Sequence, residues 1–112
     1  MNNLNSSLPV IFREDHSIIV QGPITIDNVV TMTHRGAALF DGHHLVIDLD
    51  KVTEVDSTII SMLLEWLRAT RQKGCQLQFV NMPGSVKSLI QLYGVEALIP
   101  IPVNHATQPN AT

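Results

Sequence analysis

Asp56 and Ser57 are the two residues of this sequence whose types and position best fit a chemical role. They come at the end of a polar segment that follows the mostly apolar run at residues 45–49, and they precede a helical pattern of apolar residues. The first backbone N–H groups of a helix have no partner within the helix, so a carboxylate or hydroxyl at this point can cap them. The same N–H groups and the helix dipole would stabilise a phosphate on Ser57. From these residues alone, a capping role and a role as a phosphate site or partner contact both stay open.

The segment before Ser57 is acidic. We expect residues 50–56 to form a tight loop that carries the carboxylates of Asp50, Glu54 and Asp56. A phosphate on Ser57 would add a charge of about −1.5 to −2 to this loop. The loop would then repel the carboxylates of a partner or attract its arginines, and either effect could serve as a switch.

The spacing of the other reactive side chains does not favour catalysis. Adjacent residues such as Asp56 and Ser57 do not place a base where it could take the hydroxyl proton, and no H-x-x-x-H, G-x-S-x-G or P-loop motif occurs. His43 and His44 are neighbours that would point to opposite faces of an extended segment, and His34 has no acidic residue one turn further on. We therefore predict no enzyme activity, no metal site and no cofactor.

Composition restricts the classes of partner. The 112 residues carry a net charge of −3, from 7 basic and 10 acidic residues, without a basic stripe, so nucleic acid is not an expected partner. Cys75 is the only cysteine, which excludes an intrachain disulfide and suits the reducing cytosol; we expect it to act as a small buried apolar residue. The polar first residues do not resemble a signal peptide, and no apolar run approaches the roughly 20 residues of a membrane span. We expect a cytoplasmic protein that meets a membrane only through its partner.

The first half of the chain predicts a hairpin, a helix and a central strand. Residues 10–12 and 18–20 are β-prone runs separated by polar residues, and Gly22-Pro23 should end the second strand. A helical pattern with Ile26 and Val30 among its apolar positions begins at Thr25, a suitable N-cap, with Asp27 in the first turn. The run 45–49 is typical of a central strand.

The second half alternates helices and strands. A helix is predicted from about Ser57 to Lys73, then a strand at 77–80, then a helix that opens at Pro83 and keeps Tyr93 on its apolar face. A last short strand is expected at residues 98–101. The order β-β-α-β-α-β-α-β predicts an α/β domain with a central mixed sheet and helices packed mainly on one side. We place this domain at residues 10–101, between flexible tails at 1–9 and 102–112.

The helix from Ser57 to Lys73 has an unusually broad apolar face, which covers an arc of roughly 220° at about 100° per residue. A helix on one face of a sheet needs little more than 100° of apolar surface. Packing against neighbouring helices can account for most of the excess. Met62 and Trp66 lie at the margin of the arc, where they could instead contact a partner, because Trp is enriched at interface hot spots.

Together these residues resemble the STAS family, the fold of bacterial anti-sigma-factor antagonists and of sulfate-transporter tails. The resemblance extends over roughly residues 10–101 and rests on Gly22-Pro23-Ile24-Thr25, Asp48-Leu49, Val52, Val55-Asp56-Ser57 and Lys73-Gly74. Within the family, the chain is most similar to the STAS subunit of the Mla phospholipid-transport ABC complex. That similarity rests on Leu63-Leu64, on Leu89-Ile90-Gln91-Leu92-Tyr93-Gly94 and on Leu98-Ile99-Pro100.

The resemblance implies a protein-binding module. Ser57 matches the position that is phosphorylated in anti-sigma-factor antagonists and that faces the ATPase in the Mla subunit. The implied partner is the ATPase of an ABC transporter that maintains outer-membrane lipid asymmetry, or alternatively an anti-sigma-factor kinase. Many family members have Gly where this chain has Ile59, a bulky residue that could hinder a kinase. The expected contact residues around Ser57 are Asp56, Thr58, Ser61, Met62, Glu65 and Trp66.

Overall fold

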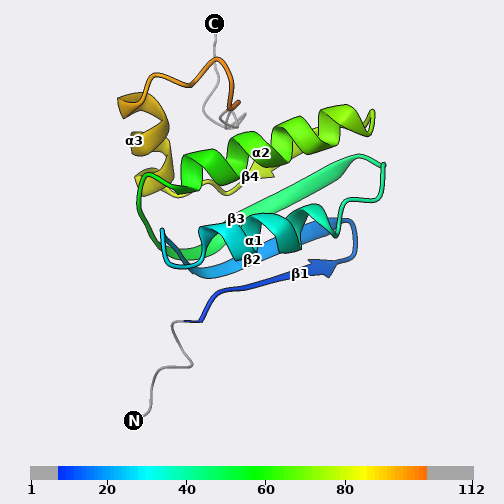
Figure 1. The fold of residues 1–112 in the computed structure, drawn as a ribbon, viewed down its shortest axis with the longest axis horizontal. Helices are drawn as coiled ribbons and strands as arrows, with labels where there is room; N and C mark the ends of the chain where they lie inside the picture. The colour runs from blue at the N-terminus through cyan, green and yellow to red at the C-terminus, as the bar shows by residue number, and fades with distance from the viewer. Residues whose placement is uncertain (1–7, 101–112) are drawn as a thin grey trace, which may run out of the picture.

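A four-stranded mixed sheet forms the centre of the computed structural model, which describes residues 8–100 (Figure 1). Its strands lie in the order β1-β2-β3-β4, and three helices follow the parallel strands. The bounds are β1 Val10–Glu14, β2 Ser17–Ile24, α1 Val29–Ala37, β3 Leu45–Val55, α2 Ile59–Gln72, β4 Leu77–Val80 and α3 Gly84–Leu92. The predicted α/β class is confirmed. Apart from Leu8 and Pro9, the predicted tails lie outside the described residues.

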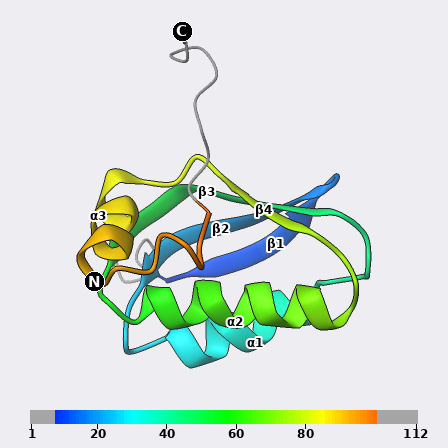
Figure 2. The ribbon, with the colours of Figure 1, turned by 90° about the horizontal axis from the view of Figure 1, so that it is seen from above.

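The pairing of the strands follows from their connections. β1 and β2 form an antiparallel hairpin, while β2–β3 and β3–β4 are parallel, as helical crossovers require. α1 and α2 lie side by side on one face of the sheet, and α3 lies at the end where the parallel strands finish (Figure 2). This confirms that the helices pack mainly on one side. Within residues 8–100, no helix combines the length and apolar character that crossing a bilayer requires.

Two predictions about strand ends were wrong around the acidic segment and Gly22. β3 continues through residues 50–55 rather than ending in a loop, because β2 accompanies it as far as the pair Ile24–Val55. β2 in turn runs past Gly22-Pro23 through a register irregularity. Gly22 adopts φ +94°, and a Cβ there would lie 3.0 Å from the Leu8 carbonyl oxygen. The glycine therefore forms a bulge, which keeps the strand intact.

The helix starts and the last predicted strand also differ from expectation. α1 begins at Val29, after a turn in which the Thr25 carbonyl accepts the N–H groups of Asn28 (3.0 Å) and Val29 (2.9 Å), so Asp27 precedes the helix. α3 ends before Tyr93, which is 55% exposed and lies off the core. The chain at Leu98 and Ile99 forms a turn closed on the Val95 carbonyl and not a strand. Ile101 of that predicted strand lies outside the described residues.

Trp66 fixes the contact between α1 and α2. Its side chain is fully buried, its indole N–H donates to the Thr33 carbonyl at 2.9 Å, and its ring meets Phe40 edge-on with centroids 6.2 Å apart. Met62, one turn earlier, is also fully buried. The prediction that Trp66 and Met62 contact a partner was wrong, because α1 covers this margin of α2.

Gly36 allows α1 to approach Trp66 closely, which generates a stability prediction. A Cβ at position 36 would lie 2.6 Å from Cε2 and 2.8 Å from Nε1 of Trp66. Because that indole is fully buried and cannot move freely, we expect Gly36→Ala to lower the free energy of unfolding by about 1–3 kcal/mol. Urea denaturation followed by circular dichroism measures the change.

Gly84→Ala is the matched control, since a Cβ at position 84 meets nothing within 4 Å. We expect this control to leave stability nearly unchanged or slightly higher, given the low helix propensity of glycine. Equal stability of the two variants would contradict the close packing of α1 on Trp66.

Candidate functional site

The starts of α1 and α2 meet at one end of the sheet, because the parallel strands β2 and β3 both finish there (Figure 1). The carboxylate of Asp56 joins them. Its Oδ2 accepts the backbone N–H of Ile26 at 2.9 Å, across the gap between the two connections. Its Oδ1 accepts the backbone N–H of Thr58 at 3.0 Å and the Thr58 hydroxyl. Asp56 therefore caps the turn that leads into α2 and also holds the turn that leads into α1.

These donors change the acidity of the carboxyl group. The hydrogen bond from the Thr58 side chain, followed by the N–H of Ile26, lowers the pKa of Asp56 below its ordinary value. Hydrogen bonds to the ionised form stabilise the charge, which is the physical cause of the shift. Asp56 is consequently an ionised structural bridge at neutral pH, with both oxygens engaged inside the molecule.

Ser57 stands next to this bridge and is exposed. Its carbonyl accepts the N–H of Ile60 at 3.2 Å, so its backbone already belongs to the first turn before α2. The side chain of Ile59 is fully buried and points into the core. It therefore does not stand between Ser57 and an approaching protein, and the expected hindrance from a bulky residue at position 59 is not met.

Ser61 and Glu65 continue the exposed strip along α2. The Ser61 hydroxyl donates to the Thr58 carbonyl at 2.7 Å, while Glu65 pairs with Arg68. The hydrogen bond from Arg68 is the main cause that lowers the pKa of Glu65. Of the predicted contact residues, Asp56, Thr58, Ser61 and Glu65 lie beside Ser57 or follow it along one strip, whereas Met62 and Trp66 lie in the core.

Two apolar residues of this surface were missed, since the helical pattern assigned them to the core face. Ile26 is 67% exposed and Val30 is 66% exposed. Ile26 is the residue whose N–H binds Asp56, and Val30 borders a hollow of about 260 Å³ between the two helices that Ser61 and Glu65 also line. Adjacency alone could not have revealed this, because consecutive helical residues point about 100° apart and can both be buried where neighbours cover a broad arc, as Met62 and Leu63 of α2 are.

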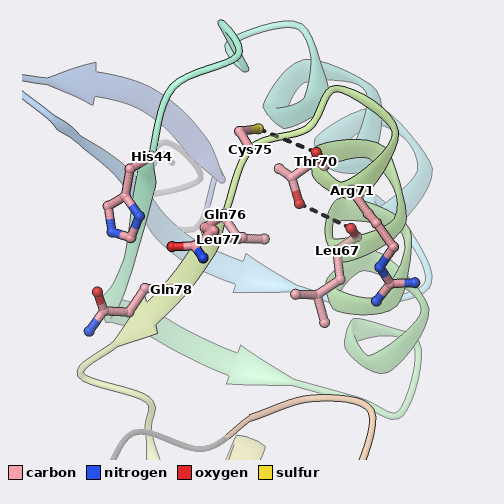
Figure 3. A pocket seen from close by; sticks show the side chains of 8 residues that line it. All are labelled: His44, Leu67, Thr70, Arg71, Cys75, Gln76, Leu77 and Gln78. Carbon is pink, nitrogen blue, oxygen red and sulfur yellow. Dashed lines mark hydrogen bonds between the residues drawn. The ribbon is translucent and has the colours of Figure 1, made fainter.

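A second hollow, of about 390 Å³, lies between the end of α2 and β4 (Figure 3). Its buried Thr70 donates to the Leu67 carbonyl at 3.0 Å, and the half-buried Cys75 thiol donates to the Thr70 carbonyl at 3.4 Å. These polar groups bond one another rather than a ligand. Within residues 8–100, no group of three or more His, Cys, Asp or Glu side chains is placed to hold a metal ion.

A comparison with models of protein families identifies the family of this chain. The model of the family STAS_2, described as "Mlab, STAS domain", matches residues 12–100. The chain belongs to the STAS family. STAS domains are generally not catalysts. No curated protein sequence matches the chain.

Solved STAS structures share the fold. The anti-sigma-factor antagonist SpoIIAA in its unphosphorylated form is 9% identical, with a TM-score of 0.63, over 88% of this chain and 91% of that protein. The murine anion transporter Slc26a9 is 26% identical, with a TM-score of 0.61, over 73% of this chain but only 14% of its own length. This STAS chain thus corresponds to a small part of that transporter and to nearly all of SpoIIAA.

The Asp56 bridge generates a pH-dependent stability prediction. In Asp56→Asn, the amide can accept at one of the two sites but not at both, so we expect a loss of about 1 kcal/mol at pH 7, typical of a lost cap. The folded pKa of Asp56 lies below its ordinary value of about 3.9, so its contribution is complete above that value and disappears as the pH falls through the folded pKa. The difference between wild type and variant should shrink below about pH 4.

Denaturation curves at pH 7 and at about pH 3 provide the measurement. Asp27→Asn, which alters an exposed carboxylate in the neighbouring turn, is the control and should show little effect at either pH. A wild-type advantage over Asp56→Asn of the same size at both values would refute the role of the ionised bridge.

Proposed function

We propose that this STAS protein binds and regulates the cytoplasmic ATPase of an Mla-type phospholipid-transport ABC complex, without catalysis of its own. The observation that carries the proposal is the match of residues 12–100 to a family model described as the Mlab STAS domain. In this proposal the protein resides in the cytoplasm, peripheral to the inner membrane through its partner. It supports the complex that maintains outer-membrane lipid asymmetry.

The surface at the starts of α1 and α2 supports binding of a folded protein. Ile26 and Val30 each expose about two-thirds of a large apolar side chain. The N–H of Ile26 binds the carboxylate of Asp56, next to Ser57, and Val30 lines the same hollow as Ser61. An apolar centre flanked by hydrogen-bonding groups is the ordinary anatomy of a protein interface. The Asp56 bridge fixes the spacing of the two helix starts, so this surface is rigid before it meets a partner. A preorganised surface loses less conformational entropy on binding.

The charge around this surface indicates the chemistry of the partner. Asp27, Glu54 and Asp56 all lie near the helix starts, and Asp56 is held ionised by its hydrogen bonds. A matching ATPase surface would therefore combine apolar side chains with lysine or arginine at its rim. Ser57 directly follows Asp56, so a negative charge placed there adds to this acidic group.

Ser57→Glu tests the position of the contact. We expect it to weaken binding to the ATPase by about tenfold or more, equivalent to about 1.4 kcal/mol, because the longer side chain separates the two surfaces and its carboxylate loses water against the apolar side chains of the partner. The melting temperature should stay nearly unchanged, since Ser57 is exposed. Titration calorimetry with the purified ATPase measures the affinity. Ser85→Glu, an exposed serine at the start of α3, is the control, and equal affinities of the two variants would disprove the placement.

Val30→Asp tests the apolar part of the same surface. Removal of this side chain and introduction of a charge should weaken ATPase binding by about tenfold, because a desolvated charge would lack a partner. Leu92→Asp is the matched control, as Leu92 is 76% exposed on α3. Both variants should fold with unchanged circular dichroism. Loss of ATPase affinity in Leu92→Asp but not in Val30→Asp would show that the binding surface is assigned wrongly.

A second candidate function is that of an anti-sigma-factor antagonist switched by phosphorylation of Ser57. The likeness to SpoIIAA over 91% of that protein supports it, because the two chains agree in fold and size. Co-purification from the native cell distinguishes the two functions. An ABC ATPase recovered with the wild-type chain and lost with Ser57→Glu supports the first proposal. Recovery of an anti-sigma kinase, together with a phosphate on Ser57 detected by mass spectrometry, supports the second.

A further inference from the structure

β1 forms one edge of the sheet. Within residues 8–100, β2 is the only strand that pairs with it, and its outer side faces away from the rest of the sheet (Figure 1). A strand edge presents unpaired N–H and C=O groups to any second extended segment. Charged side chains usually blunt such an edge, and here Arg13 and Glu14 lie near its end. The first residues of β1 are apolar, however, so the edge is only partly protected.

The hairpin geometry identifies which groups point outward. The loop of Asp15 and His16 closes on the pair Glu14–Ser17, which in a two-residue hairpin is a hydrogen-bonded pair. Bonded and non-bonded pairs alternate along an antiparallel ladder. The N–H and C=O groups of Phe12 and Val10 therefore point to β2. Those of Ile11 and Arg13 point to the outer edge.

The side chains of β1 add an apolar stripe to this edge. Val10 and Phe12 pair with Gln21 and Ile19. Because Ile11 between them packs against the core, and successive side chains of a strand alternate, Val10 and Phe12 lie on the sheet face opposite to the helices. They are 39% and 40% exposed, and Leu8, just before the strand, is 60% exposed. Large apolar side chains at alternate positions of a strand whose outer edge is unpaired favour pairing of that edge with a similar strand.

We propose that this chain self-associates by antiparallel pairing of β1 with β1 of a second copy, about a two-fold axis at Phe12. In this register Ile11 lies opposite Arg13 of the other copy, and these are the residues whose backbone groups point outward. The two Phe12 side chains face each other as a non-hydrogen-bonded pair, in which side chains approach most closely. Arg13 lies opposite an isoleucine and Glu14 opposite a valine, so no like charges are directly paired.

The neighbouring two-fold registers are less favourable. An axis at Ile11 would place Arg13 opposite Pro9 of the other copy, which has no N–H to donate. An axis at Arg13 would set the two guanidinium groups directly opposite each other, which is destabilising. Of these three registers, only the one with its axis at Phe12 keeps the outward hydrogen bonds and also avoids a pair of like charges.

The pairing does not rest on the proposed ATPase binding, because it uses the outer edge of β1 and not the starts of α1 and α2. The two surfaces adjoin at Leu8, which lines a hollow together with Ile26 and Asp56. A single pair of short strands buries a small interface, of the size found in weak and transient complexes. We expect a reversible dimer that forms as the protein concentration rises and that joins two four-stranded sheets into one.

Cysteine cross-linking of the full chain tests the register, in a Cys75→Ala background that removes the native thiol. Phe12→Cys would bring two sulfurs across the axis, where Cα atoms of a non-hydrogen-bonded pair are about 4.5 Å apart, within disulfide range. In Val10→Cys the two positions are offset by four residues, about 13 Å along the strand, and cannot bridge. Phe12→Cys should form disulfide dimers at least ten times faster than Val10→Cys under mild oxidation. Any smaller ratio overturns the register.

Edge-blocking variants provide an independent readout. Arg13→Pro removes an outward N–H that the pairing needs, while Arg13→Ala keeps it; both lose the contacts of the guanidinium with Leu39 and Asp41. Sedimentation equilibrium over a range of concentrations should show self-association for wild type and Arg13→Ala, with at least a tenfold loss for Arg13→Pro. Circular dichroism checks that each variant is folded. A monomeric wild type, or equal association of the two variants, contradicts the proposal.

Discussion

The hydrogen bonds accepted by Asp56 are the constraint on which the proposed binding surface depends. One carboxylate accepts the N–H of Ile26 before α1 and the N–H of Thr58 before α2, so two connections 30 residues apart are held at a fixed spacing. Without this bridge, the exposed Ile26 and Ser57 would belong to two independent turns. With it, they form one surface. The bridge is electrostatically robust at neutral pH, because the same donors lower the pKa of the carboxyl group.

Much of this arrangement could be predicted from the sequence, because it depends on local chemistry. An acidic residue next to a serine at the start of an apolar helix predicts a cap, and Asp56 is one. The exposure of Ser57 agrees with the same prediction. The bond from Asp56 to Ile26 could not be predicted, because it joins residues that approach only once the parallel strands β2 and β3 are aligned. A contact between residues far apart in the sequence produces no periodic pattern that a single sequence could reveal.

The errors in assigning exposed and buried side chains have one physical cause. Helical periodicity shows which residues share a face, but not how many neighbours that helix has. Trp66 and Met62 were assigned to a possible interface because the sheet alone could not cover so broad an arc; α1 covers the rest. Val30 was assigned to the core because it is apolar, yet α1 needs only one face against the sheet and α2. Gly36 was the available clue, since a glycine within a helix often marks close contact with a large side chain.

The engagement of Asp56 also limits how the surface can respond to added charge. Its oxygens are occupied by donors within the chain, so the carboxylate cannot swing away from a negative group placed on Ser57. A phosphate at that position would stand beside a fixed negative charge. The N–H groups of Thr58, Ile59 and Ile60 already bond within the chain, so the phosphate would gain its partner from a cation on the other protein. A partner surface rich in arginine would then bind the modified form more tightly, and one with carboxylates at this point would be released. The side chains of the partner therefore decide whether a phosphate on Ser57 strengthens or weakens binding. The fixed carboxylate of Asp56 keeps its own negative charge beside that phosphate.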